Sequence, residues 1–156
     1  MKKGMLILWI LAAAIMLTAC GGTTEKSAVT ATAVPLADKV KSAAAGTEEL
    51  AELNAEDLSD VLGAEAEDYR EFVFLQSDGM DGREILVIRA ADKNAAEKLK
   101  GLAENYLERR LNETRNYAPE AYKLLSEAKV QTRNLTVALI AGPEAAKETD
   151  AILSGE

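Results

Sequence analysis

The only cysteine of this 156-residue chain, Cys20, directly follows an apolar segment. Two lysines lie at positions 2 and 3, and the run 5–19 that comes after them carries no charge. A positive region followed by a short apolar core is typical of a secretory signal peptide. The run is shorter than the about 20 apolar residues that a membrane-spanning helix needs. Residues 1–19 are therefore predicted to be a signal peptide, and an uncleaved signal anchor with an incidental cysteine is the alternative.

The residues around the predicted cleavage point suggest what happens to the thiol. Leu17-Thr18-Ala19-Cys20 resembles the lipobox that bacterial lipoprotein signal peptidase recognises. In such lipoproteins a diacylglyceryl group joins the cysteine as a thioether, and cleavage then makes that cysteine the N-terminus. We expect lipidation at Cys20, anchoring in the cell membrane, and a domain on the extracytoplasmic face. Residues 20–34 would be the lipidated terminus and a flexible tether, because they are small, polar and without periodicity.

Histidine is absent from the whole chain, and this absence restricts the possible chemistry. Histidine is the usual general base and the commonest metal ligand, so His-based triads and Cys/His zinc sites are excluded. A Ser–Lys hydrolase or a glycosidase with two carboxylates needs no histidine, but no residues in the sequence stand out as such a pair. We therefore predict no catalytic residues, no metal site, and no cofactor beyond the diacylglycerol on Cys20.

Asp78 and Asp81 lie in a glycine-rich segment that could in principle bind calcium through carboxylate oxygens. An EF-hand loop requires acidic residues at alternate positions and a glutamate at its twelfth, and this segment has neither. Asp and Gly are also the residues that tight turns prefer. The segment is therefore interpreted as a hairpin turn.

The charge balance indicates which partners are excluded. The chain has 18 basic and 26 acidic residues, and its net charge of −8 becomes −10 once the lysine pair leaves with the signal peptide. Nucleic acid requires clustered lysine and arginine, so it is not an expected partner. The expected partners are the membrane, through the lipid, and an envelope protein.

Two tyrosines, Tyr117 and Tyr122, flank a segment in which the chain changes direction after a long helix. They would either cover the end of that helix or form an aromatic contact site for a partner. They are the only candidates for partner contact in the sequence.

Hydrophobic periodicity predicts the elements that position these residues. Helices are expected at 36–45, 55–62, 93–116, 119–128 and after Pro143, with a short turn from Thr47 to Leu53. Strands are expected at 72–76, 84–89, 129–133 and 135–141, which form two hairpins. The predicted fold is a single α+β domain over 35–156. Its mainly antiparallel sheet has about four strands, with helices packed on one face.

Several segments together resemble a known family. They are Glu56-Asp-Leu-Ser-Asp-Val-Leu-Gly63, the strand 84–89, Glu108-Arg-Arg-Leu111, Tyr117-Ala-Pro-Glu-Ala-Tyr122 and Ala128-Lys-Val130. In this order they are similar to small bacterial lipoproteins, mostly Gram-positive, described as domain of unknown function 4358, over about 45–145. The family often has a tyrosine where Leu62 stands here. The resemblance implies a lipid-anchored extracytoplasmic domain and provides no activity or catalytic residues to transfer.

These observations favour a non-catalytic binding or assembly module at the cell envelope. A small-ligand receptor accessory to a transporter is the alternative, although classical solute-binding proteins have two lobes. An accessory envelope enzyme is less favoured than either.

Overall fold

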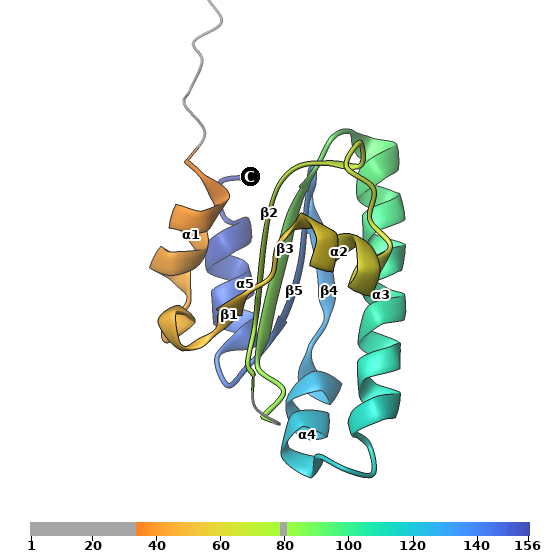
Figure 1. The fold of residues 1–156 in the computed structure, drawn as a ribbon. Coiled ribbons are helices and arrows are strands. Elements are labelled where there is room, and N and C mark those ends of the chain that lie inside the picture. Colours follow the sequence, from red (N-terminus) through yellow and green to blue (C-terminus); the bar gives the residue numbers. More distant parts are fainter. Residues whose placement is uncertain (1–33, 79–80) are drawn as a thin grey trace, which may run out of the picture. The chain divides into compact units, whose positions relative to one another are not determined.

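The computed structural model describes residues 34–78 and 81–156, so the predicted signal peptide, Cys20 and residues 21–33 lie outside the described part. The chain divides into the units Met1–Ala33 and Val34–Glu156. Within the described part of the second unit, five strands form one sheet in the order β1-β2-β3-β5-β4, and all neighbours are antiparallel (Figure 1). No helix in this part is long and apolar enough to cross a membrane.

Two hairpins make up most of the sheet, as the sequence predicts. One joins β2 (Tyr69–Gln76) to β3 (Glu84–Ala90), and the other joins β4 (Val130–Arg133) to β5 (Thr136–Ala141). The hairpins meet where β3 pairs with β5, with Val87 opposite Ala138.

The predicted strand count of about four is wrong, because a fifth strand, β1 (Ala51–Glu52), pairs with the end of β2. The segment before β1 forms a short 3-10 helix at Thr47–Glu49, within the turn that the sequence predicts. A strand of two residues has no periodicity of its own, so only its position beside β2 defines it.

The five α-helices begin and end close to their predicted limits. They are α1 (Leu36–Ala43), α2 (Ala55–Leu62), α3 (Lys93–Thr114), α4 (Pro119–Glu127) and α5 (Ala145–Leu153). Both ends of α2 are capped by residues next to it in the chain. The Asn54 side chain accepts from two backbone N–H groups of the first turn, and Gly63 ends the helix with a φ of 79°. At α3, the Asp92 side chain accepts from the Ala95 N–H.

The prediction that the helices pack on one face of the sheet is wrong. In Figure 1, α2 and α3 lie on one side of the sheet, and α1 and α5 lie on the other. Alternate residues of β3 separate accordingly: Leu86 and Ile88 belong to the core cluster with α2, α3 and α4, while Ile85 and Val87 belong to the cluster with α1 and α5. A continuous apolar run in a strand is the pattern of burial on both faces.

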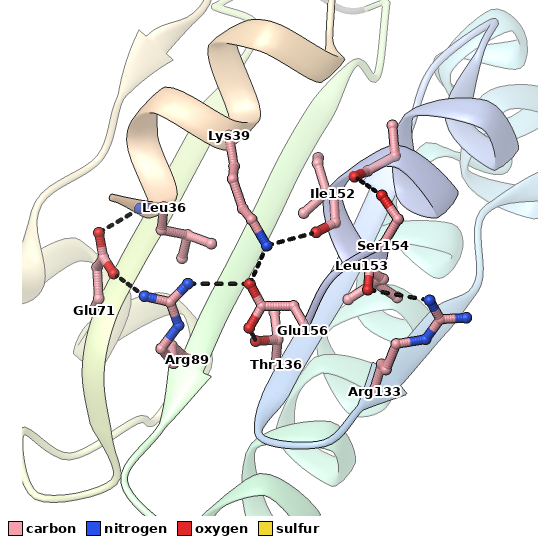
Figure 2. Close-up of polar contacts among 11 residues, drawn as sticks. Leu36, Lys39, Glu71, Arg89, Arg133, Thr136, Ile152, Leu153, Ser154 and Glu156 are labelled. Carbon is pink, nitrogen blue, oxygen red and sulfur yellow. Dashed lines mark hydrogen bonds and ion pairs between the residues drawn. The ribbon is translucent and has the colours of Figure 1, made fainter. Parts of the chain in front are cut away.

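A polar cluster at one end of the sheet connects α1 and the C-terminal residue Glu156 to the strands (Figure 2). The Glu156 carboxylate accepts from the Lys39 ammonium, from Arg89 at 3.1 Å and from the Thr136 hydroxyl at 2.7 Å. Arg89 also donates to Glu71 at 2.6 Å. Burial alone would raise the pKa of Glu156, but the hydrogen bonds from Lys39, Thr136 and Arg89 outweigh it and lower the pKa to about 2.

Candidate functional site

The turn between α3 and α4 has a fixed shape. The backbone N–H groups of Tyr117 and Ala118 both donate to the Thr114 carbonyl, at 3.2 and 3.0 Å. The Thr114 hydroxyl donates back to the Arg110 carbonyl at 2.8 Å. Pro119 then occupies the first turn of α4, where its missing N–H costs nothing. These local hydrogen bonds hold the chain where it reverses direction.

The loop between β2 and β3 packs against the start of α4. Gly82 has a φ of 76°, and a Cβ at this position would lie 2.6 Å from the Cα of Ala121. The Asp81 side chain accepts from the Arg83 N–H at 3.0 Å, which is the role of a turn aspartate. The structure thus confirms the hairpin turn. Within the described residues no group of three or more His, Cys, Asp or Glu residues is placed to hold a metal ion.

A small cavity of about 190 Å³ lies between the α3–α4 turn and this loop. We call it the turn pocket. It is lined by Gly82, Arg110, Glu113, Thr114, Tyr117, Ala118 and Ala121. Ala118 is the N-cap residue of α4, so the positive end of the α4 dipole borders the pocket. No side chain caps this end of the helix with a hydrogen bond.

A buried carboxylate, Glu84, lies next to the pocket residue Arg110. The side chain of Glu84 is fully buried at the start of β3, and its Oε2 atom accepts from the Tyr106 hydroxyl at 2.7 Å and from the Gln76 amide at 3.0 Å. Burial and the neighbouring Glu84 charge raise the pKa of the Tyr106 hydroxyl, which therefore stays protonated and donates. Glu84 is thus held by neutral donors.

The Arg110 guanidinium has fewer hydrogen bonds than its burial would suggest. Its side chain is 24% exposed, and its Nε atom is buried without a hydrogen-bond partner among the described residues. The nearest carboxylate oxygens, on Glu84 and Glu113, each lie 3.6 Å away. That distance allows charge attraction but exceeds a hydrogen bond.

The structure separates the two predicted contact residues. Tyr117 lines the turn pocket and is 80% exposed, whereas Tyr122 is half-buried with the Arg115 guanidinium 5.9 Å from its ring centroid. Tyr117 therefore does not cover the end of α3. The contact of Tyr122 is structural, because Arg115 is the residue at the C-terminal cap of α3.

Sequence reasoning missed Glu84, Tyr106 and Arg110 as a group. In the sequence, Glu84 is only the first residue of the expected strand 84–89, and Tyr106 is one residue of the expected helix 93–116. The one available signal was the spacing of four residues between Tyr106 and Arg110, which places them on the same side of α3.

Comparison with known proteins gives a family and nothing further. A family model with the description "Domain of unknown function (DUF4358)" matches residues 43–142. The matched range contains the whole sheet together with α2, α3, α4 and every residue of the turn pocket. No curated protein and no solved structure matches the chain.

Proposed function

The chain belongs to the family of domains of unknown function DUF4358, and we propose that it is a non-catalytic binding or assembly module at the cell envelope. In this proposal a lipid on Cys20 holds the domain at the extracytoplasmic face of the cell membrane. The folded part then recognises an envelope protein. The proposed contact surface is the turn pocket with the exposed Tyr117 ring at its edge.

The exposure of Tyr117 is the observation that carries this proposal. Among the described residues only Val34 and Tyr117 are large hydrophobic side chains with high exposure, and Val34 stands at the first described position. Tyrosine and arginine are enriched in the residues that dominate the energy of protein interfaces. The turn pocket has both residue types, because Tyr117 and Arg110 line it together.

The rigidity of the surface also supports binding. The backbone at Tyr117 is held by the hydrogen bonds to the Thr114 carbonyl, and Gly82 packs against Ala121 beneath the pocket. A surface that keeps its shape loses little conformational entropy when a partner binds.

The chemistry of the pocket gives no support to catalysis. Its aliphatic hydroxyl, on Thr114, already donates to the Arg110 carbonyl at 2.8 Å. No histidine exists in the chain to act as its base, and an arginine does not lose its proton in proteins. The side chains that surround the pocket are thus suited to holding a group in place.

Site-specific photocrosslinking in the native host tests the proposal. The full chain would carry a photoreactive phenylalanine analogue at Tyr117, or at Lys147 as the matched control. Lys147 is also strongly exposed but lies on α5, across the sheet. We expect a discrete protein adduct from position 117 and none from position 147.

Two results would contradict the proposal. Identical adducts from both positions would indicate nonspecific contact with the envelope. The absence of a protein adduct at 117, together with a small molecule that co-purifies with the chain, would favour a ligand receptor instead.

A further inference from the structure

The donor groups of Arg110 have fewer partners than those of the preceding residue of α3, Arg109. The Arg109 guanidinium donates to the Val61 carbonyl and lies 5.5 Å from the centroid of the Tyr106 ring. The carboxylates that flank Arg110, Glu84 and Glu113, approach it no closer than 3.6 Å, so they engage its five N–H donors only weakly. A side chain that is 24% exposed and borders a cavity therefore retains donors for an external acceptor.

The charge of Arg110 is secured by its surroundings. Burial is the largest single influence and would by itself lower the pKa of the Arg110 guanidinium, but the electrostatic contributions of Glu84, Tyr106 and Glu113 together outweigh it and raise the pKa. The hydrogen bonds that Glu84 accepts at Oε2 come from Tyr106 and Gln76. Glu84 thus contributes to the field at Arg110 without occupying its N–H groups.

The size of the turn pocket limits what it can hold. Its volume of about 190 Å³ is below the roughly 300–1,000 Å³ of sites for drug-sized ligands. That volume suits one charged group on a short carbon chain.

The walls of the pocket indicate the charge of that group. Arg110 presents a planar fork of donors, which matches a carboxylate through two parallel hydrogen bonds. Glu113 at the edge of the pocket and Glu84 behind Arg110 are both acidic. A doubly charged phosphate would meet more repulsion from them than a singly charged carboxylate does. The Tyr117 ring can cover the carbon chain that carries the carboxylate.

We infer that the turn pocket binds one carboxylate of a partner protein, presented by an acidic side chain or by a chain terminus, and that Arg110 is the residue that pairs with it. This inference rests on the proposed binding function and specifies the group that is recognised. Arg110 supplies the charged hydrogen bonds, and Tyr117 supplies the apolar cover.

Nuclear magnetic resonance on the full chain in detergent tests the inference directly. The guanidinium Nη–H signals of Arg110 and Arg109 would be followed during titration with N-acetyl-glutamate N-methylamide, which carries only a side-chain carboxylate. N-acetyl-alanine carries only a terminal carboxylate, and N-acetyl-glutamine N-methylamide is the neutral analogue of the first probe. Inorganic phosphate is the fourth probe.

We expect a saturable downfield shift of the Arg110 signal with one or both carboxylate probes, and the stronger probe identifies the source of the group. The Arg109 signal, the neutral analogue and phosphate should give little response. Arg110→Lys keeps the charge but loses the fork, so affinity should fall about tenfold. Tyr117→Ala should weaken binding about threefold, and Arg109→Ala, as the matched control, should leave it within about twofold.

Three results would overturn the inference: no saturable Arg110 shift in the wild-type chain, an equal response to the neutral analogue, or an equal response to phosphate. The wild-type signal is decisive even if Arg110→Lys does not fold. A protein adduct at position 117 combined with a silent Arg110 would refute the carboxylate site and leave the proposed function standing. An Arg110 response without any adduct would refute the proposed function and, with it, a partner protein as the source of the carboxylate.

Discussion

Replacing Glu156 by glutamine removes the negative charge that three side chains of the polar cluster share. The Glu156 carboxylate accepts from Lys39 on α1, from Arg89 on β3 and from Thr136 on β5. Glutamine keeps the size of the side chain but no longer attracts the two cations. We therefore expect Glu156→Gln to loosen the contact of α1 with the sheet and to lower the free energy of unfolding.

The size of the effect follows from the pKa of Glu156, which the cluster lowers from 4.5 to about 2. At about 1.4 kcal/mol for each pKa unit, the upper limit is roughly 3 kcal/mol at neutral pH. The side chains of Lys39 and Arg89 are each 19% exposed. Solvent screening reduces the expected loss to about 1–2 kcal/mol, which corresponds to a fall of about 4–8 °C in Tm.

The sign of the pH dependence provides a second measurement. Because the folded-state pKa is lowered, the stabilisation is fully present above the ordinary pKa of 4.5 and is lost as the pH falls from 4.5 towards 2. Urea unfolding of residues 21–156, followed by far-UV circular dichroism, should show the largest difference between wild type and Glu156→Gln at pH 7. At pH 3 the difference should fall below about half of that value.

The matched control is Glu67→Gln, at an exposed glutamate with no side-chain hydrogen bond or ion pair among the described residues. This control should change stability by less than about 0.5 kcal/mol. A Glu156→Gln variant that is as stable as wild type at pH 7, or a difference that stays constant down to pH 3, would refute the reasoning.

Three further predictions can be checked independently. Gly82→Ala should destabilise the domain by about 2 kcal/mol or more in urea unfolding, because its φ of 76° and the contact with α4 both disfavour a Cβ. The control is Gly101→Ala in the middle of α3, where a Cβ would meet nothing within 4 Å. This control should stabilise the domain by about 0.5–1 kcal/mol. Metabolic labelling with a fatty-acid analogue should tag the wild-type chain and fail to tag Cys20→Ala, and labelling that survives the substitution would contradict lipidation there. Millimolar calcium and EDTA should leave the melting curve unchanged, whereas a calcium-dependent rise in Tm that disappears in Asp78→Asn/Asp81→Asn would make the hairpin loop a metal site.

Local signals in the sequence were sufficient for most helices and both hairpins. Asn54 and Gly63 mark the two ends of α2 because capping depends on residues next to each other in the chain. Asp81 and Gly82 mark the turn between β2 and β3 because tight turns need the side-chain acceptor and the positive φ that these residues provide. Such features depend on near neighbours and can be read without knowledge of the fold.

The sides of the sheet on which the helices pack could not be read in the same way. Every residue of β5 is buried, so the strand has no polar face to show which side meets solvent. The pairing of β3 with β5 joins segments that the whole of α3 and α4 separates. As a result, α1 and α5, from opposite ends of the domain sequence, cover the same face of the sheet.

Part of the candidate site could likewise be found from the sequence, and part required the fold. Tyr117 was identified from its place beside a proline turn, and its exposure could be recognised only once the turn had a shape. Arg110 and Glu84 are far apart in the sequence, one within a charged helix and the other at the start of an apolar strand. Only the packing of α3 on β3 brings their side chains within 3.6 Å.

The sequence by itself determined the family to which the chain belongs, its local elements and the chemistry that its residue types exclude. These depend on composition and on short spacings, which a linear sequence records directly. The tertiary structure decided the fifth strand, the two packed faces, the buried Glu84 network and the turn pocket. Each of these arises where distant segments meet, and burial there leaves Arg110 charged, partly exposed and short of hydrogen bonds.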